Sequence, residues 1–256
     1  MNKNKPSSVR VGNCKDCQYK TTLLGSNSCK PGDACVAVES GRQIDRFFRA
    51  NPGLAVDYLN DGFWERRAIA ARYAPQELLI RLLADPDETV RRAVAYRLPL
   101  DELVRMATDP DREVRITVAD RLPADELGSL IDDPDYLVRT YVARRLPAGR
   151  LFSMLRDPDR QVRQVVAQRL PLESLVFLGD DPEPDIRRIV AERMEVEQLN
   201  RFANDPDWTV RYVVANRASL EVVELLKDDS EPLVQEEATR RLADTLHSDG
   251  RYGANC

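Results

Sequence analysis

Apolar residues recur along the chain in groups of three whose members are four residues apart, and the groups return every 24 residues. In the copy that begins at Asp85 the group consists of Val90, Val94 and Leu98. A spacing of four places these side chains on one face of an α-helix, and the intervening residues are mostly charged or small. The pattern predicts one amphipathic helix of about three turns in every copy.

An aspartate precedes each predicted helix of the eight copies, and in six of them proline follows it. The Asp-Pro pair recurs at Asp85, Asp109, Asp133, Asp157, Asp181 and Asp205, and Asp61 and Asp229 extend the register to eight copies. With this Asp as position 1, Pro at position 2 and an acid at position 3 or 4 predict a helix start that the position-1 side chain caps. Asp85 and Glu88 have the spacing of a capping box. Pro99, at position 15, is expected to end the helix.

About eight residues remain in each copy after the helix. They carry apolar residues at positions 19 and 22, such as Leu103 and Met106, and a spacing of three fits one or two turns of α- or 3₁₀-helix. A second long helix does not fit, because repeats with two long helices need about 40 residues. One copy cannot bury its apolar face alone, so the sequence predicts an all-α solenoid of stacked 24-residue repeats.

The repeat pattern divides the chain into four regions. Residues 1–40 form a cysteine-rich segment that lacks the pattern. Residues 41–60 keep a divergent version of it, with Phe47 and Phe48 in the expected helix, and are predicted to be an N-terminal capping repeat. Residues 61–246 hold about eight repeats, and residues 247–256 are expected to be a frayed tail.

Composition favours a folded cytoplasmic protein that does not enter the membrane. Of the chain, 43% is hydrophobic, yet no stretch approaches the roughly 18 apolar residues that a membrane span requires. The net charge is −5, and beyond the first thirty residues the cations are almost all Arg, outnumbered by Asp and Glu. Nucleic-acid binding is therefore disfavoured, although it is not excluded.

The residues that catalysis by side chains requires are scarce. The single histidine, His247, lies in the expected tail, and the chain has no phosphate-binding loop and no dinucleotide fingerprint. It also has no serine or cysteine nucleophile with a partner base. We expect a protein that is not an enzyme.

Four cysteines are grouped near the N-terminus. Cys14, Cys17, Cys29 and Cys35 form the pattern C-x2-C-x11-C-x5-C, whereas Cys256 is distant and is expected to be a free thiol. Four thiolates can bind an iron–sulfur cluster or a zinc ion. Structural zinc sites usually pair two C-x2-C-like turns, and only the first pair here has that spacing, so the pattern favours a cluster over zinc, with disulfides a lesser alternative. Nearby lysines could offset the charge of a cluster or could simply be solvated; they are Lys15, Lys20 and Lys30.

The unit D-P-D-x-x-V-R-x-x-V-A-x-R-L-P at a period of 24, preceded by this cysteine-rich segment, resembles the leucine-rich repeat variant family in its iron–sulfur-containing branch. The resemblance implies alternating α- and 3₁₀-helices wound as a right-handed superhelix. It also implies an N-terminal [4Fe-4S] domain, with the four grouped cysteines as ligands. It implies no reaction.

Two rows of arginine run through the repeats. Position 7 holds Arg91, Arg115, Arg139, Arg163, Arg187 and Arg211, and position 13 holds Arg97, Arg121, Arg145, Arg169, Arg193, Arg217 and Arg241. Such rows could grip phosphates, but an acid precedes each position-7 arginine by four residues, as in Asp87 and Arg91, and predicts pairs within one helix. The position-13 arginines are expected to reach the Asp row of a neighbouring repeat or the last carbonyls of the helix.

Positions 4, 8 and 12 vary freely and are expected to face solvent. The aromatic residues there are candidate anchors for a partner protein, namely Tyr96, Tyr136, Trp208 and Tyr212; the alternative is that each packs against the next repeat. The sequence thus predicts an iron–sulfur repeat protein that acts as a protein-interaction scaffold. Its cluster would transfer electrons, sense redox state or stabilise the solenoid end. The alternatives are a nucleic-acid-binding solenoid and a zinc-stabilised scaffold.

Overall fold

The computed structural model describes the backbone of residues 11–249 and the side chains of residues 11–244. Within this part of the chain the regular secondary structure is helical, apart from one isolated antiparallel bridge between Lys30 and Ala34. The chain divides into two compact units, residues 1–126 and residues 127–256.

The first unit consists of the cysteine-rich segment followed by alternating long and short helices. Its long helices are α1 (Gly41–Ala50), α2 (Trp64–Tyr73), α3 (Glu88–Ala95) and α5 (Arg112–Arg121), and its short ones are the 3₁₀-helices η1 (Pro52–Tyr58), η2 (Gln76–Leu82) and η3 (Val104–Met106) and the single α-turn α4 (Leu100–Leu103). Helices α1 and η1 occupy the predicted capping repeat.

The second unit continues the same alternation. Its long helices are α6 (Tyr136–Arg145), α7 (Arg160–Arg169), α8 (Pro184–Arg193), α9 (Trp208–Arg217) and α11 (Pro232–Asp249), and its short ones are η4 (Leu127–Leu130), η5 (Ala148–Met154), η6 (Leu172–Leu178), η7 (Val196–Phe202) and α10 (Leu220–Glu224).

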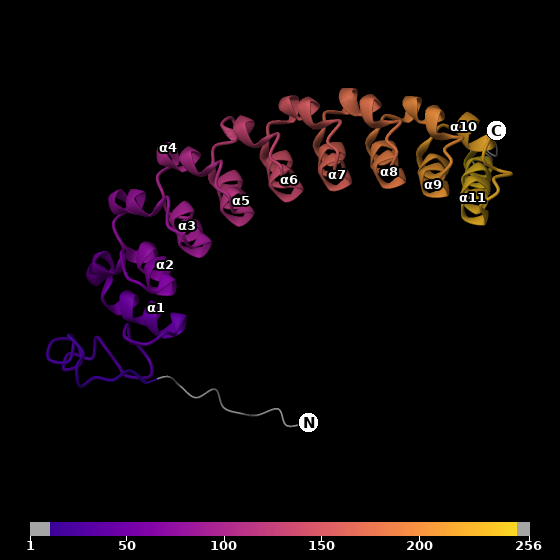
Figure 1. Ribbon diagram of the computed structural model, residues 1–256. Helices are drawn as coiled ribbons and strands as arrows, with labels where there is room; N and C mark the ends of the chain where they lie inside the picture. Colours follow the sequence, from indigo (N-terminus) through magenta and orange to yellow (C-terminus); the bar gives the residue numbers. More distant parts are fainter. Residues whose placement is uncertain (1–10, 250–256) are drawn as a thin grey trace. The chain divides into compact units, whose positions relative to one another are not determined.

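Within each unit the long helices lie side by side in one row and the short helices form a second row (Figure 1). Successive long helices pack on one another, as α2 does on α3 and α8 on α9. Each repeat therefore covers the apolar face of its neighbour, which is how a short unit gains a core. The predicted all-α repeat fold is confirmed in these stacked helical units.

The core forms at the predicted apolar positions. Val90 and Val94 of the long helix α3 and Leu98, just after it, are at most 1% exposed, and Leu103 and Met106 of the short element are at most 3% exposed. Equivalent residues of the other repeats are buried in the same way. The short element is a 3₁₀-helix in most repeats, as its spacing of three suggests.

The long helices do not begin where the Asp-Pro pattern predicted. The cap of α5 is Asp111 at position 3, whose Oδ1 accepts hydrogen bonds from the backbone N–H groups of Glu113 (2.9 Å) and Val114 (3.1 Å). Asp109 at position 1 accepts the N–H of Asp111 at 2.9 Å and is only 8% exposed. The prediction that position 1 caps the helix is therefore wrong: Asp109 and Pro110 form the preceding turn.

The helices end close to the predicted proline. Helix α5 ends at Arg121, and its C-cap residue Leu122 directly precedes Pro123. At the other end of the chain, α11 runs to Asp249, so residues 247–249 of the expected tail are helical. The remaining tail, with Cys256, and the side chain of His247 lie outside the described residues. No helix in the described part combines the length and the apolar content that crossing a membrane requires.

Candidate functional site

The cysteine-rich segment precedes α1 and contains a tight loop. The loop is closed by the bridge between Lys30 and Ala34, in which each backbone N–H donates to the other residue's carbonyl oxygen at 2.8 Å. Gly32 within the loop has φ 81°, a left-handed conformation that glycine adopts without a steric penalty. Cys29 and Cys35 flank the bridge, so the turn brings these two cysteines together.

All four grouped thiols share one electrostatic neighbourhood. Burial, and after it the charges of Cys35, Cys17 and Cys14, raises the pKa of the Cys29 thiol to about 11. Cys29 and Cys35 are buried, Cys14 and Cys17 are half-buried, and all four are free of disulfides. Burial and the neighbouring sulfurs thus disfavour the thiolate of Cys29, and a bound cationic metal core would favour it.

Space beside one of these sulfurs depends on a glycine. A Cβ built on Gly12 would lie 2.9 Å from Cys35 Sγ, closer than side chains approach one another. Among the described side chains, those of residues 11–244, no three or more His, Cys, Asp or Glu are grouped as the ligands of one metal ion are. The four sulfurs thus lie in one neighbourhood, but they do not converge on one point as the ligands of a single metal ion do. Four thiols without histidine fit the ligand set of an iron–sulfur cluster, and by type they also fit zinc.

Hydrogen bonds hold the cysteine-rich segment against α1. The N–H of Cys35 donates to Gln43 O at 3.1 Å. The side-chain amide of Asn51, just after α1, donates to Ser28 O at 2.7 Å and to Phe47 O at 2.9 Å. These bonds hold the loop of Cys29 and Cys35 against the first long helix.

Aromatic contacts fasten the same segment from its other side. The ring of Tyr19 lies 5.4 Å from the ring of Phe47, which is fully buried. The hydroxyl of Tyr58, in η1, donates to the hydroxyl of Tyr19 at 3.1 Å. Burial, and after it this hydrogen bond, raises the pKa of Tyr58. These contacts of Tyr19 were not predicted from the sequence. The only sequence signal for them was that Tyr19 lies two residues after Cys17.

The lysines considered as counter-charges of a cluster are exposed, namely Lys15, Lys20 and Lys30.

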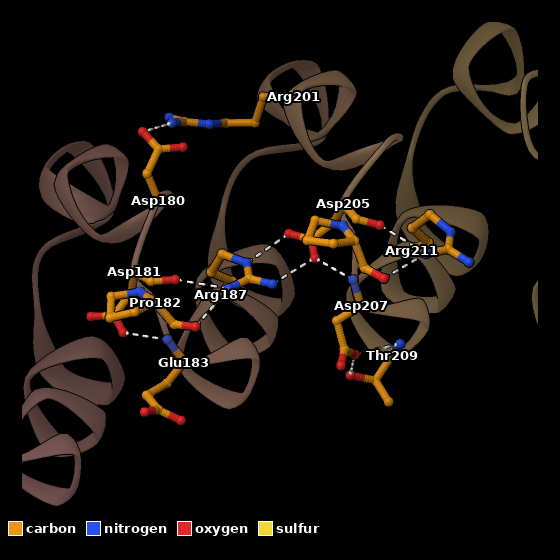
Figure 2. Close-up of polar contacts among 11 residues, drawn as sticks. Asp180, Asp181, Pro182, Glu183, Arg187, Arg201, Asp205, Asp207, Thr209 and Arg211 are labelled. Atoms are coloured by element: carbon orange, nitrogen blue, oxygen red, sulfur yellow. Dashed lines mark hydrogen bonds and ion pairs between the residues drawn. The ribbon is translucent and has the colours of Figure 1, made fainter.

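The position-7 arginines join consecutive repeats (Figure 2). Arg187 donates from Nε and Nη2 to the two carboxylate oxygens of Asp205, both at 2.8 Å, and from Nη1 to the carbonyl oxygen of Asp181 at 2.8 Å. The same bidentate pair recurs at Arg67–Asp85, Arg91–Asp109, Arg139–Asp157, Arg163–Asp181 and Arg211–Asp229. Each guanidinium thus ties the turn that begins its own repeat to the turn that begins the next.

The predicted pairing of Arg91 with Asp87 in the same helix is therefore wrong. Arg91 binds Asp109, eighteen residues further along the chain, while Asp87 caps α3 through the N–H of Thr89. The hydrogen bond that Arg91 donates to the carboxylate of Asp109 raises the pKa of Arg91. Side chains in the Arg91–Asp109 pair are 10% and 4% exposed, so the charges are neutralised in a nearly dry contact.

The position-13 arginines bind carbonyl oxygens of the preceding repeat. Arg169 Nη1 donates to Ala143 O at 2.6 Å and Leu146 O at 2.8 Å, at the end of α6. Arg97, Arg121, Arg193 and Arg241 bond to the equivalent carbonyls within their own units. Of the two predicted partners, the Asp row of a neighbouring repeat is wrong for these arginines. Their bonds do reach the last carbonyls of a helix, but that helix belongs to the preceding repeat and not to the arginine's own. Both arginine rows are thus engaged in holding repeats together.

The aromatic candidates lie in different surroundings. Trp208 (40% exposed) and Tyr212 (37% exposed) line one hollow of about 550 Å³ on the long helices of the second unit, together with Leu233 of α11. Tyr96, in the first unit, is 60% exposed beside Arg92, and Tyr136, at the start of α6, is half-buried. The structure brings Trp208 and Tyr212 together, and it places Tyr96 and Tyr136 outside that hollow.

Comparisons with known proteins agree with both parts of the chain. Residues 10–57 match a family model described as "LRV protein FeS4 cluster", which spans the cysteine-rich segment together with most of the capping repeat. The segments 88–111, 112–135 and 136–159 match the model described as "Leucine rich repeat variant". The N-terminal part of the chain is thus an FeS4 cluster region of this kind of protein.

Proteins similar to this chain include a curated relative and a solved structure. An uncharacterized 27.7 kDa protein in the nifB 3′ region of Rhodobacter capsulatus is 40% identical over 85 residues, which are 33% of this chain and 34% of that protein, so the chain matches about a third of its length. A solved structure described as "a leucine-rich repeat variant with a novel repetitive protein structural motif" is 57% identical, with a TM-score of 0.85 over 90% of this chain and 98% of that one. The chain therefore belongs to the leucine-rich repeat variant family.

Proposed function

We propose that this chain is a cytoplasmic iron–sulfur protein in which Cys14, Cys17, Cys29 and Cys35 hold a [4Fe-4S] cluster, and that its repeats bind another protein. The observation that carries the proposal is the gathering of four free thiols in one neighbourhood, within a region that matches an FeS4 cluster family. A reducing compartment keeps such thiols available for metal.

A cluster at this place would join the cysteine-rich segment to the start of the repeats. The loop of Cys29 and Cys35 is hydrogen-bonded to Gln43, and Tyr19 packs on Phe47. A cluster that fixed the cysteines would therefore also fix the cysteine-rich segment against α1. Such a cluster supplies one-electron redox chemistry when it is bound. Cys14 and Cys17 are only half-buried, which leaves one edge of the site open to solvent or to a partner. Stabilisation of the N-terminal end and redox exchange are both compatible with this geometry.

Exposed aromatic residues on the repeats support the interaction role. The hollow of Trp208 and Tyr212 is mainly apolar, and the ion pair of Arg188 with Glu192 lies at its edge. An apolar hollow with large aromatic side chains is typical of a protein-binding surface. We propose it as a contact for a partner protein, with Tyr96 and Tyr136 as lesser candidates.

The engaged arginines weigh against the nucleic-acid alternative. The position-7 guanidinium groups are bound to carboxylates, and the position-13 groups to carbonyl oxygens, so neither row offers a free line of cations to phosphates. If the protein were retained on a nucleic-acid column and the retention fell steeply with salt, the result would support nucleic-acid binding.

The experiment is metal and sulfide analysis of anaerobically purified protein, with its absorption spectrum. We expect about four iron and four labile sulfide per chain, and loss of both in Cys29→Ser or Cys35→Ser. Cys256→Ser is the matched control and is expected to keep the cluster. About one zinc per chain without iron would replace the cluster by a zinc site.

A further inference from the structure

The short helices of the second unit leave a row of apolar side chains in solvent. Leu172, Val196 and Leu220 are the first residues of η6, η7 and α10, and they are 44%, 39% and 38% exposed. All three occupy position 16 of consecutive repeats. The core does not need them, because Leu175 and Leu199 of the same short helices fill it and are fully buried.

Exposed aromatic rings also lie on the short helices of this unit. Phe152 of η5 and Phe177 of η6 are 54% and 62% exposed, and their rings meet edge to face at 5.1 Å across neighbouring repeats. Val176, beside Phe177, is 42% exposed. Two phenylalanines that pack on each other in solvent, rather than in a core, mark a surface that a partner covers.

A row of carboxylates accompanies the apolar row. Glu173, Glu197 and Glu221 follow directly after Leu172, Val196 and Leu220, and all three are exposed. In the described part of the chain none of the three has a recorded ion pair or side-chain hydrogen bond.

Other acids in or directly after the short helices do have partners. Asp180 pairs with Arg201, as Figure 2 shows, and Glu224 pairs with Lys227. An acid in the first turn of a helix interacts favourably with the positive end of the helix dipole. This interaction can explain why each of these three short helices carries one acid there. It does not account for the exposed apolar residue beside each one.

We propose that this short-helix face binds an amphipathic helix of a partner protein that carries Lys or Arg at every seventh residue and apolar residues beside them. Negative charges in a row require a basic occupant, and the apolar residues require an apolar face on it. The inference rests on the interaction half of the proposed function and names the partner's chemistry.

The repeat spacing selects a helix over a strand. Neighbouring helices pack about 8–10 Å apart, so the carboxylates recur at about that interval. Seven residues of an α-helix advance about 10 Å and return to the same face after two turns. Same-face residues of a strand recur at about 7 or 13 Å, which does not match.

The test measures binding of a synthetic helical peptide to the full cluster-loaded chain by calorimetry. The probe has Leu along one face and Lys at every seventh position, and its matched control has Glu in place of Lys. We expect the Lys peptide to bind, more weakly at higher salt, and the Glu peptide not to bind.

Variants of the protein locate the contact. Removing the three carboxylates as Glu173→Gln, Glu197→Gln and Glu221→Gln is expected to weaken binding about tenfold, because exposed charge pairs each contribute modestly. Phe152→Ser with Phe177→Ser is expected to abolish binding. The control removes three exposed carboxylates from long helices, as Glu88→Gln, Asp185→Asn and Glu236→Gln, and is expected to leave binding unchanged.

Several results would overturn the proposal. Equal binding of both peptides, or full binding by the triple Gln variant of the short helices, would do so. A wild-type dimer in sedimentation that this variant converts to monomer would assign the face to a second copy instead. Iron and sulfide are measured on the same samples. Protein that holds the cluster but does not bind the Lys peptide would therefore contradict this docking inference and leave the cluster assignment unaffected.

Discussion

Both carboxylate oxygens of Asp205 accept hydrogen bonds from the guanidinium of Arg187, which precedes it by eighteen residues, at 2.8 Å each. The same carboxylate accepts the backbone N–H of Asp207 at 2.9 Å, and Asp207 in turn caps α9. One buried carboxylate therefore connects the helix of one repeat with the start of the next helix. Repetition of this connection explains why the helices stack in a fixed register.

The buried pair of Arg163 and Asp181 is expected to be essential for stability. Its side chains are 11% and 3% exposed, so Arg163→Ala leaves a carboxylate buried without its counter-charge. We expect a loss of about 3–5 kcal/mol in the free energy of unfolding, measured by urea denaturation. Arg160→Ala on the same helix is the control, since Arg160 is exposed, and a change of less than about 0.5 kcal/mol is expected there. Equal effects of the two variants would contradict the role of the pair.

The position-13 arginine is expected to matter through its two hydrogen bonds rather than through its charge. Arg169→Leu leaves Ala143 O and Leu146 O without this donor and should cost about 2–3 kcal/mol. Arg169→Lys keeps the charge but should recover only part of the lost stability. The recovery is partial because an ammonium group lacks the extended donor geometry of a guanidinium. Thermal unfolding measures all three proteins, and a Leu variant as stable as wild type would refute the bonds.

Stability is expected to fall in acid, because hydrogen bonds to the charged forms of Asp229 and Asp207 hold their pKa values below the ordinary value. The main cause is the guanidinium of Arg211 for Asp229 and the hydroxyl of Thr209 for Asp207. A carboxyl whose pKa is lower in the folded state stabilises the fold above its unfolded value of about 4, and this contribution is lost as the pH falls through the folded value. Urea midpoints should stay level from neutral pH to about pH 5 and drop below about pH 4.

The matched variant for acid sensitivity is Asp229→Asn. It removes one of the titrating groups, so its urea midpoint should be lower at neutral pH and should depend less on pH below about pH 4. A midpoint that falls as steeply in this variant as in wild type would exclude Asp229 as a source of the effect.

Gly12→Ala is expected to impair cluster binding while leaving the repeats folded. The new methyl group would lie 2.9 Å from Cys35 Sγ, whereas a Cβ on Gly25, in the same segment, would meet nothing within 4 Å. We expect lower iron content per chain in Gly12→Ala, wild-type iron in Gly25→Ala, and helical circular dichroism unchanged in both. Full iron content in Gly12→Ala would show that the space beside Cys35 is not needed.

The repeat fold could be predicted because every copy carries the same local sequence pattern. Val90, Val94 and Leu98 mark one buried face, Pro99 follows the end of the helix, and each prediction depends only on residues within one repeat. The helix caps were predicted wrongly because Asp109 and Asp111 are both suitable, and choosing between them needs knowledge of what else Asp109 binds.

The arginine contacts could not be derived from the rules for single helices, because they connect different repeats. A signal was nevertheless present: each position-7 arginine precedes the position-1 Asp of the next repeat by a constant eighteen residues. The cysteines could be proposed as ligands from their grouping and from the family resemblance. The contact between Tyr19 and Tyr58 could not, because it joins segments 39 residues apart with no periodic pattern.

Native mass spectrometry of the anaerobically purified chain tests the central claim most directly, because it weighs whatever the four cysteines hold. The account predicts an excess mass equal to four iron and four sulfur atoms, which disappears in Cys35→Ser and persists in Cys256→Ser. An excess equal to one zinc atom, or an unchanged excess in Cys35→Ser, would contradict it.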